Sequence, residues 1–143
     1  MLFRATLLAC LTPLAAMAEV HEVKMLNRND TGPMVYEPEY LVIAPGNSVK
    51  FLATDPGHNA ATIAGMIPGE GKKFIGKINE EIEVKLDDAG TWGIKCSPHY
   101  TMGMVMLVQV GDTPATEADL PADLPDAVRQ RMTEILARHA AAE

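Results

Sequence analysis

Residues 91–110 read TWGIKCSPHYTMGMVMLVQV. We expect two β-strands joined by a short loop, because polar and apolar residues alternate from Thr91 to Cys96 and apolar residues dominate after Gly103. Trp92 and Ile94 fall on the same face of the first strand as Cys96. Cys96 therefore continues an inward-facing apolar row, and the loop begins directly after it.

The rest of the chain repeats this pattern of short strands and turns. The β-type runs are Val20–Leu26, Tyr40–Ile43, Ser48–Ala53, Ile82–Leu86, Thr91–Cys96 and Met104–Val110. Segments rich in Gly, Pro, Asn and Asp separate them, at residues 29–33, 44–47, 68–71 and 87–90. Regular spacing of strands and turns predicts an all-β sandwich or barrel.

The pattern of short strands and turns ends at Gly111. Residues 112–125 form a Pro- and Asp-rich connection, after which one stripe recurs at helical spacing: Leu124, Val128, Met132, Ile135, Leu136 and His139. We interpret the stripe as an amphipathic helix that packs on the sandwich, in preference to a partner-binding helix. The expected organisation is one domain at 19–112 and a C-terminal helical extension at 113–143.

The first 18 residues are predicted to be an export signal peptide. Arg4 gives the positive start, residues 5–14 are apolar, and Ala16-Met17-Ala18 has the pattern of a cleavage site. A membrane span is the alternative, but the run is interrupted by Pro13 and is shorter than the roughly 20 residues that a bilayer crossing needs. A lipoprotein signal ending at Cys10 is a second alternative. We expect an exported, periplasmic protein without stable membrane insertion.

Cleavage would leave a chain of 125 residues with a lone cysteine, Cys96, and we expect it to be a monomer. The formal net charge of the full chain is −7, which argues against nucleic acid as a partner. The charge is uneven, however, because basic residues gather at a few positions, namely Arg28, Lys72, Lys73, Lys77 and Lys95. An acidic chain with such a set can still present a positive face.

The segment that begins at Cys96 carries candidate ligands for a soft metal. A thiolate from Cys96 and an imidazole from His99 are followed by thioethers at Met102, Met104 and Met106. This mixture of sulfur and nitrogen favours copper. Zinc is disfavoured, because a structural zinc site normally uses several thiolates. Spacing alone leaves the choice among the three methionines open.

A trigonal copper site with two imidazoles, one thiolate and a long axial thioether needs a second histidine from elsewhere. The candidates are His21, His58 and His139. His58 is best placed, because it lies in a turn directly after a predicted strand and a sandwich gathers several such loops at one end. His21 lies near the mature N-terminus, and His139 lies on the terminal helix.

Four segments of the chain resemble pseudoazurin, a family of bacterial type 1 copper proteins. They are residues 57–59 (GHN), 65–68 (GMIP), 77–80 (KINE) and 96–104 (CSPHYTMGM). The resemblance runs from about residue 20 to Gly111 and extends to the two-helix tail that pseudoazurins carry. It implies a Greek-key cupredoxin β-sandwich at 19–112 holding one copper ion, which cycles between Cu(I) and Cu(II). It also implies the ligands His58, Cys96, His99 and Met104, with Asn59 tying the His58 loop to the Cys96 loop.

The same resemblance implies a periplasmic electron carrier. We do not expect an enzyme, because four protein ligands would leave no open coordination position and no general acid or base is expected beside the metal. The expected acceptors of the carrier are acidic-faced redox enzymes such as the nitrite reductase of denitrification, and its expected donors are cytochromes or membrane complexes. The main alternative is a copper storage or delivery protein with the same fold; a small copper oxidase and a metal-free interaction module are weaker ones. The chain departs from many pseudoazurins at Pro56, where they carry Lys, and this bears on partner preference.

Overall fold

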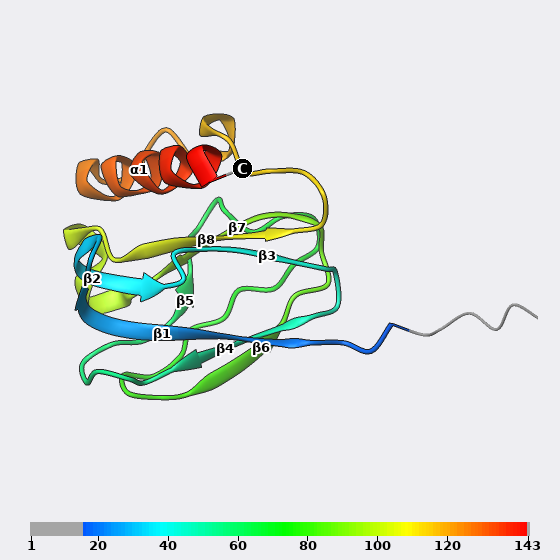
Figure 1. The fold of residues 1–143 in the computed structure, drawn as a ribbon, viewed down its shortest axis with the longest axis horizontal. Helices are drawn as coiled ribbons and strands as arrows, with labels where there is room; N and C mark the ends of the chain where they lie inside the picture. The colour runs from blue at the N-terminus through cyan, green and yellow to red at the C-terminus, as the bar shows by residue number, and fades with distance from the viewer. Residues whose placement is uncertain (1–15, 143) are drawn as a thin grey trace, which may run out of the picture.

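A computed structural model describes residues 16–142, and these residues form two β-sheets packed face to face with an α-helix on the outside (Figure 1). The strands are β1 (Val20–Asn29), β2 (Gly32–Glu37), β3 (Tyr40–Ile43), β4 (Ser48–Leu52), β5 (Ala61–Thr62), β6 (Ile82–Lys85), β7 (Gly90–Lys95) and β8 (Val105–Val110). The helical segments of this part of the chain are the 3-10 helices η1 (Ser97–Met102) and η2 (Glu117–Asp119) and the α-helix α1 (Asp126–Ala142). The expected all-β sandwich with a C-terminal helix is confirmed.

The chain crosses repeatedly between the two sheets. One sheet has the order β2-β1-β4-β6 and the other the order β3-β8-β7-β5. β1 pairs with β4 and β3 pairs with β8 in parallel, whereas the other pairs are antiparallel. Strand neighbours that are distant in sequence therefore bring loops from several parts of the chain to the same end of the sandwich.

Each predicted strand is present, with ends displaced by a few residues, but two strands were not predicted. Residues 29–33 are predicted to form a turn. In the structure the turn occupies only Asp30 and Thr31, and β2 begins at Gly32. β5 contains two residues, which is too short to show an alternating pattern. Short elements of this kind depend on their neighbours in space more than on their own sequence.

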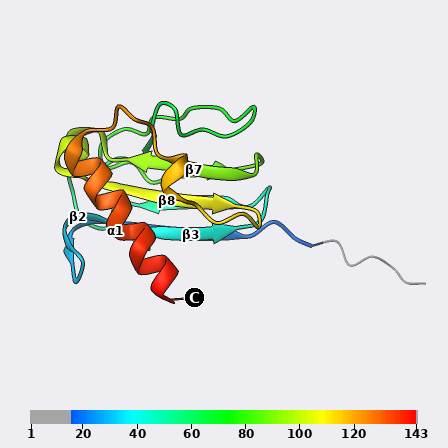
Figure 2. The ribbon, with the colours of Figure 1, turned by 90° about the horizontal axis from the view of Figure 1, so that it is seen from above.

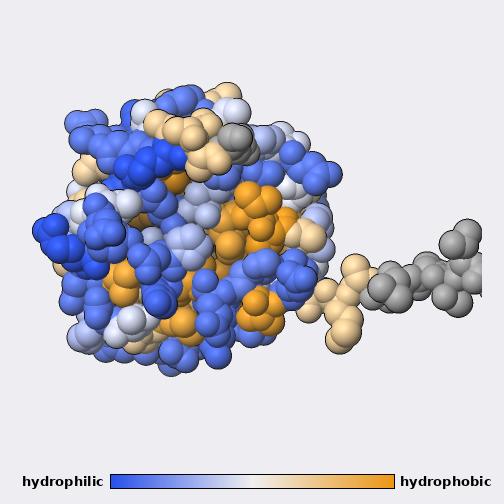
Figure 3. Space-filling view, in the orientation of Figure 1, coloured by the Kyte–Doolittle hydropathy of each residue, from blue (hydrophilic) through white to orange (hydrophobic). Residues whose placement is uncertain are grey.

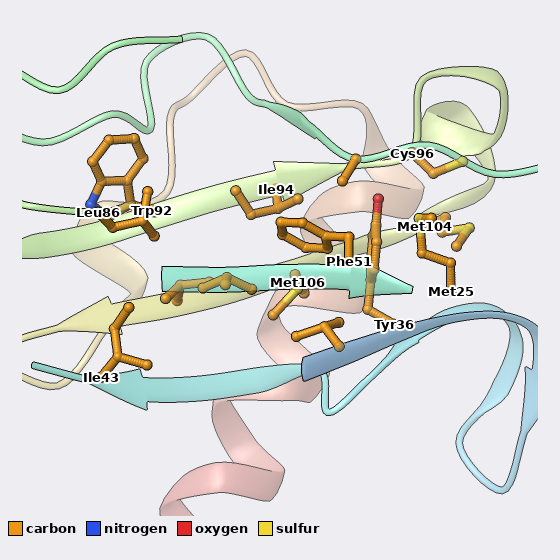
Figure 4. Packing of buried hydrophobic residues seen from close by; sticks show 14 of the residues in the cluster. Met25, Tyr36, Ile43, Phe51, Leu86, Trp92, Ile94, Cys96, Met104 and Met106 are labelled. Carbon is orange, nitrogen blue, oxygen red and sulfur yellow. The ribbon is translucent and has the colours of Figure 1, made fainter. Parts of the chain in front are cut away.

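The main core lies between the sheets (Figure 4). In β4, Val49 and Phe51 are fully buried while their neighbours are partly exposed, as the alternation predicted. Trp92, Ile94 and Cys96 likewise belong to this core. Burial of each large apolar side chain contributes about 1.5–3 kcal/mol, so the core is the main source of stability.

A second core lies between the outer face of β8 and α1, which crosses over β8 and β3 (Figure 2). β8 is buried along its whole length, since Met106 faces the first core and Leu107 the second. The helix contributes Val128, Met132 and Ile135 to the second core. The predicted apolar stripe is thus the face that packs on the sandwich.

The tail differs in detail from the two helices that the resemblance implied. Its first helix, η2, is a 3-10 turn of three residues, and only α1 is an α-helix. Pro114, Pro121 and Pro125 explain the difference, because each lacks the N–H that an α-helical hydrogen bond requires.

The predicted signal peptide at 1–18 lies mostly outside the described residues, and its cleavage stays a prediction. The described chain is anchored from Glu19 onward, where the backbone N–H donates to Asn47 Oδ1 at 3.0 Å. Among residues 16–142, no helix has the length and apolar character of a membrane span.

The face drawn in Figure 3 is largely hydrophilic, and the largest of its apolar patches lies over the edge strand β3. Val42, at the middle of that strand, is 49% exposed. β3 has only four residues, and short edge strands limit pairing with a second chain.

Candidate metal centre

The loop between β7 and β8 folds back on itself at the left end of Figure 1. Cys96 is the N-cap of η1, and its N–H donates to the carbonyl of Met104 at 3.0 Å. The N–H of Met104 donates in turn to the carbonyl of His99 at 3.2 Å. The side chains of Cys96, His99 and Met104 are therefore carried by one closed loop.

Gly103 makes this closure possible. Its φ of 87° lies in the left-handed region, which side chains other than glycine rarely adopt. A Cβ at this position would also lie 2.9 Å from the carbonyl oxygen of Ala127 on α1. The loop therefore ends at a residue that both its own turn and the packing of the helix restrict to glycine.

His58 reaches the same end from the turn that follows β4. Gly57 precedes it with a φ of 95°, and the Gly57 N–H donates to Asn79 Oδ1 at 2.7 Å. The N–H of Asn79 donates to the carbonyl of His58 at 2.8 Å. Asn79 thus holds the turn by two hydrogen bonds, and the His58 side chain is buried with 1% exposure.

Three donor atoms converge where the two loops meet. Cys96 Sγ lies 3.7 Å from His58 Nδ1 and 3.4 Å from His99 Nδ1, and the two nitrogens are 3.1 Å apart. These side chains form the one group of metal-binding type found among the described residues. The histidine that the sequence analysis preferred is the one that the fold brings to Cys96.

The other two candidate histidines lie outside the cluster. His21 lies beside Asn47 and Glu19, and His139 stacks on the ring of Tyr40 with a centroid distance of 3.6 Å. Neither belongs to the cluster.

Burial and position along β8 together distinguish the three methionines. Met104 is fully buried near Cys96 in the main core (Figure 4), whereas Met102 is 53% exposed. Met106 lies further along β8, opposite Ile94. Met104 is therefore the methionine best placed for the centre.

Asn59 joins the two loops, as the resemblance implied. Its Oδ1 accepts the backbone N–H of Ser97 at 2.6 Å, and its Nδ2 donates to Ser97 Oγ at 3.1 Å. Nδ2 also donates to the carbonyl of Gly76 at 2.9 Å. A fourth hydrogen bond comes from Tyr36, whose hydroxyl donates to the Asn59 carbonyl at 2.7 Å. Asn59 therefore ties the His58 loop to the Cys96 loop at Ser97, the residue directly after Cys96.

Asn27 contacts the cluster from β1, and the sequence analysis did not identify it. Its Oδ1 lies 2.7 Å from Nε2 of His58. A hydrogen on Nε2 satisfies this contact and leaves the lone pair of Nδ1 directed at Cys96, so Asn27 sets the tautomer of the ring. Asn27 is a polar residue within a long strand, and no local motif marks it.

Burial also controls the protonation of the cluster. Burial lowers the pKa of His58 and the adjacent His99 lowers it further, whereas the carboxylate of Asp55 raises it. Burial raises the pKa of the Cys96 thiol, although hydrogen bonds from the backbone of Asn59 and His99 oppose this effect. Cys96 must therefore lose a proton before it can act as a thiolate ligand.

Comparison with known proteins identifies the family. Residues 23–111 match the model of copper-binding proteins of the plastocyanin/azurin family. A pseudoazurin of Paracoccus pantotrophus is 42% identical over 135 residues, which cover 94% of this chain and 92% of that protein. The chain belongs to the pseudoazurin family.

Two solved pseudoazurin structures have the same fold as this chain. That of Methylobacterium extorquens has a TM-score of 0.77 at 40% identity, covering 84% of this chain and 98% of its own. That of Sinorhizobium meliloti has a TM-score of 0.80 at 35% identity, covering 87% and 99%. The fold is therefore the cupredoxin sandwich of the pseudoazurins.

Copper is the cofactor of this pseudoazurin-family chain, which is an electron-transfer protein. The donor atoms fit the ion. The point equidistant from Cys96 Sγ and the two Nδ1 atoms lies about 2 Å from each, close to the roughly 2.0–2.3 Å of the bonds that zinc makes to these ligand types. Soft sulfur with imidazole is also the ligand chemistry that copper prefers.

Proposed function

We propose that His58, Cys96, His99 and Met104 hold one copper ion and that the chain carries single electrons between redox partners. The convergence of Cys96 Sγ and the Nδ1 atoms of His58 and His99 around one point is the observation that supports this most strongly. Met104 would be the weak axial ligand, because it is buried beside Cys96 and its backbone is bonded to the same loop.

The bound ion would supply a Cu(I)/Cu(II) couple, and the protein would supply ligands that hardly move between its two states. Asn59 and Asn79 hold the two loops in one arrangement, and Asn27 holds the ring of His58. Rigid support of this kind suits electron transfer, because little rearrangement then accompanies each redox step.

We propose a carrier and not an enzyme. Side chains of the protein would occupy every ligand position, so no position stays open for a substrate. Beyond His58, Cys96 and His99, no acidic or histidine side chain joins the cluster among residues 16–142, so no further group there is placed to act as a general acid or base.

We propose export to the periplasm, where residues 1–18 would be removed. The charged start, short apolar run and small residues before Glu19 support this location. The single cysteine of the mature chain would then be protected from oxidation by burial, because Cys96 has 0% exposure.

The proposed partners are acidic-faced redox enzymes such as nitrite reductase, with cytochromes or membrane complexes as electron donors. Four of the five basic residues singled out above are exposed, namely Arg28, Lys72, Lys73 and Lys77. Exposed apolar side chains lie among or near them in sequence, at Ile75 and Ile78. Exposed basic side chains on the docking face would steer encounter with an acidic partner and permit fast release.

Charge reversal at this set should slow electron transfer to an acidic-faced reductase. We expect Lys72→Glu with Lys73→Glu to lower the second-order rate constant about tenfold at low salt, because steering of this kind changes association rates by at least that factor. The difference should shrink near physiological ionic strength, where screening acts over about 8 Å. Stopped-flow mixing of the reduced protein with the reductase measures both effects.

A matched control reverses two lysines elsewhere. Lys24 and Lys50 alternate with the inward-facing residues Val23, Val49 and Phe51, so they lie on the outer face of the first sheet. Lys24→Glu with Lys50→Glu makes the same change in net charge and should slow the reaction far less. Equal rates for the Lys72/Lys73 variant and the parent at low salt would contradict docking through this set.

A further inference from the structure

Arg131 connects α1 to the turn that begins β2. Its Nη2 donates to the carbonyl of Pro33 at 3.0 Å and its Nη1 donates to the carbonyl of Met34 at 3.2 Å. The planar guanidinium thus binds two successive carbonyls with one rigid fork. This contact joins residues almost a hundred positions apart in the sequence.

The backbone that Arg131 holds is strained. Met34 has a φ of 52°, in the left-handed region that a side chain other than glycine or asparagine seldom adopts. Such a conformation persists only when the surroundings enforce it, and it is common at functional sites. The two hydrogen bonds from Arg131, on α1, hold the carbonyls of Pro33 and Met34 and so support the left-handed conformation of Met34.

The strained residue lies opposite the residue that orients His58. Leu26 pairs with Val35 and Arg28 pairs with Pro33 in the antiparallel β1–β2 ladder, so the register places Met34 opposite Asn27. Asn27 in turn meets Nε2 of His58 through its side chain. The other side of Asn27 is held by Asp55, whose carboxylate accepts its N–H at 2.7 Å. The position of Asn27 therefore depends on contacts from two directions.

The same part of α1 contacts the other loop of the centre. Ala127 and Arg131 are the residues that a side chain at Gly103 would meet. Arg131 also lines a small pocket of about 160 Å³ with Met102, which follows His99 in the loop. Figures 1 and 2 both place the first half of α1 above the end of the molecule where β2 and η1 lie.

We propose that Arg131 is a positioning residue for the metal centre, which holds the Met34 turn so that Asn27 keeps its hydrogen bond to His58. The C-terminal helix then supports the ligand geometry as well as covering the sandwich. This inference rests on the proposed ligand role of His58.

The test uses Arg131→Met, which keeps the unbranched stem and the helix propensity but removes the fork. Arg129→Met is the matched control, because Arg129 lies on the same helix and donates to the carbonyl of Pro121, away from the centre. The readout is the exchange rate of the His58 Nε2 proton with solvent in the copper-free protein, compared with core amides such as that of Val108. Copper-loaded samples supply the visible spectrum as a second readout.

In Arg131→Met we expect the His58 proton to exchange about tenfold faster relative to the core amides, as expected for the loss of hydrogen bonds from a charged donor. The visible spectrum should change as well, while Arg129→Met changes neither readout. Equal acceleration of the His58 proton and the core amides, or the same effect in both variants, would show that Arg131 is merely structural. The exchange experiment needs no copper, so a failure of the proposed ligand set would leave its result standing.

Discussion

Cys96→Ala should abolish the intense visible band that the intact protein gives with Cu(II). The band requires charge transfer from a thiolate to copper, and Cys96 is the free cysteine found among the described residues. The variant should still fold, because a buried cysteine acts as a small apolar residue and its truncation costs only about 1 kcal/mol. Absorption spectra recorded during addition of Cu(II) measure the loss.

Val108→Ala is the control for this experiment. Val108 belongs to the same buried core, but it lies on β8 away from the two loops. Its truncation should lower stability by about 2 kcal/mol and leave the band intact. A Cys96→Ala protein that stayed coloured would contradict the assignment of the thiolate.

His58→Ala should weaken copper binding by more than about 100-fold, because even residues that only support a ligand change metal affinity by about 10- to 100-fold. The apoprotein should remain folded, since the sandwich core consists of apolar side chains from both sheets. His99→Ala should open a coordination position that an added imidazole can occupy. Competition with a chelator of known affinity measures the first effect, and titration with imidazole measures the second.

His21→Ala is the control here. His21 contacts Asn47 and Glu19 and does not belong to the cluster, so its removal should leave both affinity and spectrum unchanged. The ligand assignment would be wrong if His21→Ala lost the copper spectrum while His58→Ala kept it.

The core of the site could be predicted because its information is local. Cys96, His99 and Met104 belong to one short loop, and the alternation of β7 already pointed Cys96 inward. The choice of His58 needed only the expectation that loops gather at one end of a sandwich. The choice of Met104 needed the family resemblance, because Met104 and Met106 are equally buried and only their positions along the chain differ.

The supporting residues could not be predicted, because their roles depend on contacts between distant segments. Asn27 is 31 residues from His58, and Arg131 is 97 residues from Met34. Neither pair leaves a periodic or spaced pattern in the sequence. β2 was missed for a related reason, since its strand conformation depends on pairing with β1 and includes a left-handed Met34.

Repeated reduction and reoxidation of the copper-loaded protein in the presence of a Cu(I) chelator tests the carrier function most directly. The ligands, of which His58 and Cys96 are buried, and the bonded loops that hold them should keep the ion in both oxidation states. The account therefore predicts that the visible band returns to full intensity after every cycle. A band that declines cycle by cycle as the chelator takes up copper would contradict it and would indicate a storage or delivery protein.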